Sequence, residues 1–132
     1  MDSVFGYQLA NIFFFVFHIL LILFNLLGWI WKKSRKWNLF TLCLTAFSWF
    51  GLGIFYGWGY CPLTDWHWQV RDELGLITPY NSYIQFLIVE LSGIKITALN
   101  ADRLSVIAFG LALGCSMVAN FNLSATKKRK RR

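Results

Sequence analysis

A thiol, an imidazole and a guanidinium lie close together in the middle of the chain, at Cys61, His67 and Arg71. A catalytic thiol needs a nearby base or a positive field to form thiolate. One alternative is therefore a small membrane enzyme or redox protein, in which His67 is the base and Arg71 contacts an anion. The alternative that we favour makes Cys61 a small apolar filler where a helix meets the surface.

A second set of polar residues, Asn11, His18 and Asn25, is spaced by seven in an apolar segment and falls on nearly one helical face. Polar side chains at membrane depth normally face protein or a water-filled cavity. We favour a packing seam in which each side chain hydrogen-bonds a neighbouring helix. The alternative is a ligand, haem or proton site centred on His18.

Cofactor and metal chemistry has weak support in the sequence. A haem bridged by His18 and His67 is disfavoured, because His18 lies roughly 15 Å inside its predicted helix whereas His67 is predicted at the surface. The chain has no C-x-x-C or H-x-x-x-H cluster for zinc, no phosphate loop and no serine-hydrolase elbow. We expect no metal site, and the sequence leaves the cofactor unknown.

The elements that must position these residues are apolar helices. The chain is 57% hydrophobic and only 14% charged, which is far from the composition of a soluble domain. Segments at about 8–31, 37–59 and 101–121 are each long enough to cross about 30 Å of hydrocarbon. We predict a single all-α integral membrane domain over residues 1–132, with three transmembrane helices and one or two short interfacial helices between the second and third.

The basic residues predict the orientation of these helices. Ten of the thirteen lie in two runs without acidic residues, namely Lys32, Lys33, Arg35 and Lys36, and the tail from Lys127 to Arg132. This distribution is typical of the positive-inside rule. We therefore expect the N-terminus outside, an outer region at about 60–100, and a basic cytoplasmic tail at 122–132. Both runs would contact anionic lipid headgroups, and we do not expect a nucleic-acid partner.

The outer region begins with Pro62, which should end the second helix. Thr64 or Asp65 could cap a surface helix that Gly75 would stop. The apolar side of this helix would face lipid and its polar side, with His67, would face water or partners. A further helix from Tyr83 to Leu91, capped by Asn81 or Ser82 and ended by Gly93, is too short to span, so it would be interfacial or re-entrant.

Small residues in the third predicted span indicate close packing. Ala108, Ala112 and Ser116 share one face, and Gly110 with Gly114 forms another small-residue pair. Gly53 and Gly57 form a similar pair in the second span. We expect other helices to approach these positions.

Nearly the whole chain resembles the bacterial membrane proteins grouped as domain of unknown function 2784. The residues that carry the resemblance are His18, the motif Cys61-Pro62-Leu63-Thr64, and then Arg71 and Gly75. Many members carry a glutamate near the place of His67, where this chain has Asp65-Trp66-His67-Trp68. The resemblance implies the helical membrane fold and the bacterial inner membrane, and it implies no activity.

These observations predict a non-enzymatic membrane protein that binds a lipid or cofactor, or serves as an accessory subunit of a larger membrane complex. It would use the outer region around the Cys61–Thr64 motif. This is our preferred interpretation, with the enzyme built on Cys61, His67 and Arg71 as the alternative.

Reporter fusions test the predicted orientation. A reporter inserted at Ser34 and a reporter fused after Arg132 should both be active in the cytoplasm, because the two basic runs resist translocation. A fusion at Leu76, in the predicted outer region, is the matched control and should report the opposite compartment. Different compartments for Ser34 and Arg132 would contradict the three-span scheme.

Overall fold

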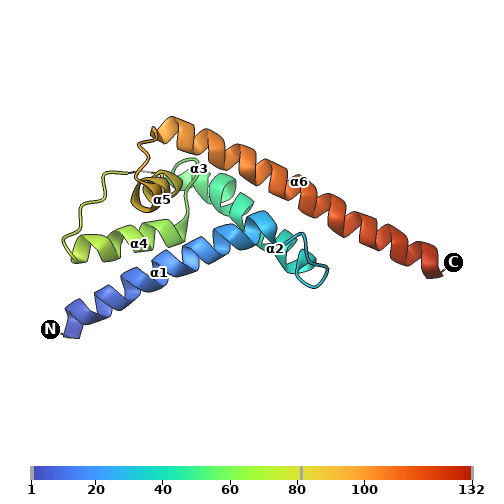
Figure 1. Ribbon diagram of the computed structural model, residues 1–132, viewed down its shortest axis with the longest axis horizontal. Helices are drawn as coiled ribbons and strands as arrows, with labels where there is room; N and C mark the ends of the chain where they lie inside the picture. The colour runs from blue at the N-terminus through green and yellow to red at the C-terminus, as the bar shows by residue number, and fades with distance from the viewer. Residues whose placement is uncertain (1, 81, 132) are drawn as a thin grey trace.

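The computed structural model describes the backbone of residues 2–80 and 82–131 and the side chains of 3–80 and 82–121. All regular secondary structure in this part of the chain is helical. Its elements are, in order, α1 (Asp2–Leu27), α2 (Arg35–Ala46), the π-helix η1 (Phe47–Leu52), α3 (Gly53–Tyr56), α4 (Pro62–Glu73), α5 (Tyr83–Ser92) and α6 (Ala98–Arg131). Figure 1 shows α4 beside the N-terminal half of α1, with α5 between α4 and the start of α6.

Three helices are long and apolar enough to cross a membrane: Ser3–Leu27, Arg35–Tyr56 and Ala98–Phe121. The second of them is a continuous run of α2, η1 and α3. The predicted fold class is thereby confirmed, since the two short helices α4 and α5 lie between the second and third spans. The chain is a multi-pass membrane protein.

The first helix ends earlier than we predicted, at Leu27 rather than near Trp31. Gly28 begins a turn in which two backbone carbonyl groups accept hydrogen bonds from side chains later in the sequence. Ser34 Oγ donates to Gly28 O at 2.7 Å, and Arg35 Nε donates to Trp29 O at 2.9 Å. These bonds close a compact turn before α2 begins at Arg35, so Trp29 and Trp31 lie in the turn.

The start of α4 also differs from the prediction. Cys61 is the N-cap and Pro62 is the first helical residue, whereas we expected Thr64 or Asp65 as the cap. Proline is well suited to the first helical position, because it has no N–H to leave unpaired and its φ is already helical. Proline also holds Cys61 in an extended conformation, with φ −135° and ψ 118°.

The predicted ends of α4 and α5 are confirmed. After α4, Gly75 has φ +72°, and Leu76 N donates to Arg71 O at 2.9 Å, which is the pattern of a Schellman motif. Gly93 ends α5 with φ +73°. Ser82 caps α5 by accepting a bond from Gln85 N at 3.2 Å, while the alternative cap Asn81 lies outside the described residues.

A buried polar seam joins α1 to α2. Asn25 Nδ2 donates to Thr45 Oγ1 at 3.0 Å, and Thr41 Oγ1 donates to Asn25 Oδ1 at 2.7 Å. Asn38, which is fully buried, donates through Nδ2 to the carbonyl of Phe24 at 2.6 Å. These bonds link the two helices through polar groups, as is common between helices in membranes, and Asn38 Oδ1 is buried without a partner among the described residues.

The third span packs through the predicted small-residue face. Ala112 and Ser116 are buried, and α6 contacts α1, α2 and α5. The glycine prediction was wrong for Gly110 and Gly114, because a Cβ at either position would meet nothing within 4 Å. Within the described residues, no other helix approaches these two glycines. The side chains of the basic tail, 122–132, lie outside the described part.

Gly28 provides a test of the α1–α2 packing. A Cβ at this position would lie 2.6 Å from Phe24 O and 2.8 Å from Asn38 Nδ2. We expect Gly28→Ala to lower the free energy of unfolding by about 1–3 kcal/mol, since these groups must shift. Thermal denaturation in mild detergent measures the effect.

Gly110→Ala is the matched control. It adds the same methyl group to a helix in open space, where alanine is the better helix former by about 1 kcal/mol. Its melting temperature should stay the same or rise. Equal losses in both variants would contradict the packing of Gly28 against Asn38.

Candidate functional site

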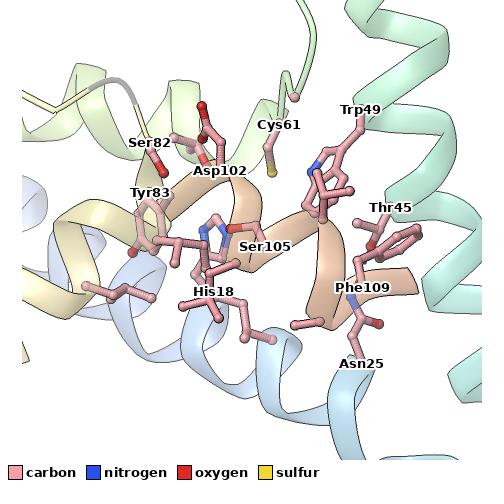
Figure 2. Close-up of a pocket in the computed structure, with 18 of the residues that line it drawn as sticks. His18, Asn25, Thr45, Trp49, Cys61, Ser82, Tyr83, Asp102, Ser105 and Phe109 are labelled. Atoms are coloured by element: carbon pink, nitrogen blue, oxygen red, sulfur yellow. Dashed lines mark hydrogen bonds between the residues drawn. The ribbon is translucent and has the colours of Figure 1, made fainter. Parts of the chain in front are cut away.

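A cavity of about 720 Å³ lies between the helices and is partly open to the outside. Its walls come from α1, α2, η1, α5 and α6 and from the loop before α4. Figure 2 shows the imidazole of His18, the indole of Trp49 and the thiol of Cys61 directed toward the middle of this cavity. The site is therefore built from segments far apart in the sequence.

The lining is mostly apolar and its polar groups are few. Leu21, Ile22, Leu42, Leu87 and Phe109 are among the apolar residues that line the cavity. The polar side chains of the lining include those of His18, Asn25, Thr45, Thr64, Ser82, Asp102 and Ser105, together with the thiol of Cys61. In Figure 2, Ser82, Asp102 and Cys61 lie at one side of the cavity, and Asn25 and Phe109 lie at the other.

The π-helix η1 positions one wall. A π-turn widens the helix by one residue and is frequent at functional sites. Here it directs Trp49 at α6, where its ring lies 4.9 Å from that of Phe109. Trp49 O accepts a bond from Gly59 N at 3.2 Å, and Ser48 Oγ donates to Tyr60 O at 2.7 Å. The loop that carries Cys61 is therefore tied to the same short helix.

His18 lies against the ring of Tyr83. The centres of the two rings are 3.8 Å apart and the rings are nearly parallel, at 9°. Only 7% of the His18 side chain is exposed, and its Nδ1 is buried with no hydrogen-bond partner among the described residues. A buried polar atom without a partner costs about 1–3 kcal/mol. His18 is thus an unsatisfied polar group in the wall of the cavity.

Tyr83 connects His18 to a hydrogen-bonded chain. His67 Nε2 lies 2.7 Å from Asn11 Oδ1, and His67 Nδ1 lies 3.0 Å from Tyr83 Oη. Because Asn11 Oδ1 can only accept, Nε2 of His67 carries the proton and Nδ1 accepts the Tyr83 hydroxyl proton. This chain of bonds joins α1, α4 and α5.

Burial sets the protonation of His67 and Tyr83, which both lie outside the three spans. Burial, with a smaller contribution from the positive charge of Arg71, lowers the pKa of His67 from 6.5 to about 4. Burial raises the pKa of the Tyr83 hydroxyl above its usual value of 10. His67 is therefore a neutral acceptor at physiological pH, and Tyr83 keeps the proton that it donates.

The structure places the three predicted polar residues of the first helix against protein. Asn11 meets His67, Asn25 meets Thr41 and Thr45, and His18 meets the ring of Tyr83. Asn11 and Asn25 each hydrogen-bond a neighbouring helix, as in the packing seam that we favoured. His18 differs from them, because it lines the cavity and its Nδ1 stays unpaired.

The predicted surface position of His67 was wrong. Its side chain is fully buried, because α4 packs along α1 and turns this residue inward instead of toward water. The exposed side of α4 carries Trp66, Gln69 and Asp72.

Cys61, His67 and Arg71 do not form a hydrogen-bonded set in the described part of the chain. Cys61 lines the cavity, while both nitrogens of His67 bond to Asn11 and Tyr83. Arg71 Nε donates to Thr78 Oγ1 at 2.7 Å, and its guanidinium lies 4.8 Å from the centre of the Phe86 ring. Of the Pro62–Trp66 stretch, Thr64 reaches the cavity, and Asp65 accepts a bond from Tyr60 Oη at 3.2 Å.

The same bonds bear on metal and haem chemistry. His67 has no nitrogen left for a metal while both are engaged with Asn11 and Tyr83. No group of three or more His, Cys, Asp or Glu side chains is placed to hold a metal ion among the residues that the structure describes. The geometry does not present a bis-histidine site.

Several residues of the site were not predicted from the sequence. Tyr83 was treated only as the start of a short helix, and Trp49 was not singled out. Asp102 was not singled out either, although it lines the cavity with Ser105. One available signal was the aromatic residue directly after the cap Ser82, since α5 must bury that side against some other helix.

The fold and the cavity together define a small multi-pass helical membrane protein with an internal site between its spans. The family model described as "Protein of Unknown function (DUF2784)" matches residues 8–121, and the chain belongs to this family. The resemblance noted in the sequence is thereby confirmed. Neither the curated proteins nor the solved structures compared with the chain gave a match.

The lowered pKa of His67 predicts how stability changes with pH. Below pH 6.5 the unfolded chain binds a proton at this residue that the folded chain does not bind, so stability falls as the pH drops from 6.5 toward 4. The slope that His67 contributes is at most about 1.4 kcal/mol per pH unit. Melting temperatures in detergent between neutral pH and pH 5 measure it.

His67→Gln is the control for this pH dependence. Glutamine can still donate and accept hydrogen bonds but does not titrate, so the variant should lose this part of the slope. If the wild type and His67→Gln lose stability in parallel over this range, His67 is not the group responsible.

Proposed function

We propose that this chain is a non-enzymatic membrane protein that holds a lipid-like molecule in the cavity between α1, η1, α5 and α6. The observation that carries the proposal is a largely apolar cavity of about 720 Å³ with a buried, unpartnered histidine in its wall. This volume is within the range of small-molecule sites, and an apolar lining with a few convergent polar groups is their usual composition.

The surroundings of the cavity favour a ligand from the bilayer. Large apolar side chains such as Leu20, Leu23 and Val106 remain exposed on α1 and α6, and lipid is expected to cover them. A void of this size without contents would lose dispersion contacts along all its walls. An acyl or isoprenoid chain from the same lipid phase can fill it without leaving apolar surroundings.

The contacts give less support to the alternative of a thiol enzyme. A catalytic cysteine needs a base within hydrogen-bond reach, whereas His67 bonds to Asn11 and Tyr83. Arg71 is held by Thr78 and Phe86. Each of these groups therefore has a structural partner, and binding is the simpler function.

We further propose the bacterial cytoplasmic membrane, with the basic α1–α2 turn and the basic tail in the cytoplasm. Supporting this orientation, the turn and the C-terminal end of α6 lie toward the same end of the molecule, and α4 lies toward the other (Figure 1). An accessory role in a larger complex is compatible with this proposal.

Filling the cavity tests the proposed function. Wild-type protein purified in mild detergent should carry a copurifying lipid, detected by native mass spectrometry and by extraction. Ser105→Trp should abolish that species, because Ser105 lines the cavity and the indole would occupy it.

Ile107→Trp is the matched control on the same helix. Ile107 is exposed and does not line this cavity, so the variant should retain the lipid and melt at the wild-type temperature. Wild-type protein without any bound small molecule, or equal lipid content in both variants, would contradict the proposal.

A further inference from the structure

We infer that the head group of the bound molecule is uncharged and bears a hydroxyl, and that His18 binds it. This inference rests on the proposed function and specifies the class of its ligand. Three observations carry it: the unpaired nitrogen of His18, the charges that line the cavity, and the position of Asp102.

His18 is the first observation. It lines the cavity, it is more than nine-tenths buried, and Nδ1 has no partner among the described residues. A neutral imidazole offers one N–H donor and one acceptor nitrogen. A hydroxyl can satisfy either of them, because it both donates and accepts, so it suits this ring in either tautomer.

The ring of Tyr83 fixes where that hydroxyl must come. Tyr83 covers one face of the imidazole at 3.8 Å, and its own hydroxyl is committed to His67 Nδ1. Tyr83 therefore cannot turn to bond with His18 without giving up its partner. His18 lines the cavity, so a hydroxyl bound there is the partner that we propose for the edge of its ring.

The charges of the lining are the second observation. Asp102 is the one charged residue among those that line the cavity, and no lysine or arginine is among them. Phosphate, sulfate and carboxylate heads are normally held by such basic residues. A buried anion without a paired cation is costly. Phospholipid heads are thus poorly matched to the inner end of this site.

The position of Asp102 is the third observation. Asp102 lies on the same side of the cavity as Ser82 and Cys61 in Figure 2, and its side chain is exposed. Its carboxylate makes no ion pair within the described residues. A negative charge there repels anionic heads. It could attract a cationic head, but that head would stop at Asp102 and leave His18 unsatisfied.

Three amphiphiles that share the oleyl chain test the inference: oleyl alcohol, oleyl sulfate and oleylamine. Each is added to delipidated full-length protein in mild detergent, and binding is followed by native mass spectrometry and melting temperature. We expect oleyl alcohol to bind about tenfold more tightly than oleyl sulfate, a difference equivalent to about 1.4 kcal/mol. Oleylamine should also bind more weakly than the alcohol.

Variants assign the effect to residues. His18→Leu should weaken oleyl alcohol about tenfold and leave oleyl sulfate unchanged, whereas a merely structural role would weaken all three. His18→Gln keeps a donor and an acceptor and should retain binding of the alcohol. Asp102→Asn should strengthen oleyl sulfate and so reduce the preference for the alcohol over the sulfate.

The outcomes separate this inference from the proposed function. Tightest binding of oleyl sulfate, or tightest binding of oleylamine that Asp102→Asn removes, overturns the inference and leaves a lipid site of another class. Failure of all three amphiphiles to bind overturns the proposed function and the inference with it.

Discussion

Polar side chains inside a hydrocarbon layer must find partners within the protein, because lipid tails offer none, and this constraint organises the molecule. Asn25 bonds to Thr41 and Thr45 and holds α2 beside α1. Asn11 bonds to His67 and holds α4 along the other half of α1. The polar face of α1 therefore positions both α2 and α4. Among the described residues, two buried side-chain atoms have no hydrogen-bond partner, Asn38 Oδ1 and His18 Nδ1, and of these two residues His18 lines the cavity.

The site depends on how tightly its surroundings are fixed. Tyr83, Phe86 and Leu87 form the buried cluster of α5, with side chains of α1 and α4 packed around it. The hydroxyl of Tyr83 is directed by His67, so its ring stays flat on His18. A ligand that reaches His18 therefore meets a pre-oriented ring and need not spend free energy on ordering it.

The spans could be predicted from the sequence because length and hydropathy decide them, and Gly75 and Gly93 ended their helices as expected from their freedom to adopt positive φ. The burial of His67 could not be predicted from the sequence of α4, because the polar residues around His67 indicated a solvent-exposed face. It follows from a long-range contact with Asn11. The role of Tyr83 also depends on long-range contacts, in its case with His67 and His18. The π-turn from Phe47 to Leu52 carries no composition signal, so the inward direction of Trp49 was beyond reach as well.

The wide turn of η1 sets the phase of the second span. Inserting one residue into a helix rotates everything beyond it by about 100°. The threonines before η1 therefore face α1, while Trp49 within η1 faces α6. One continuous rod thus contacts both α1 and α6, and the cavity is lined by side chains of all three. The π-turn adds Trp49 to that wall without any break in the rod.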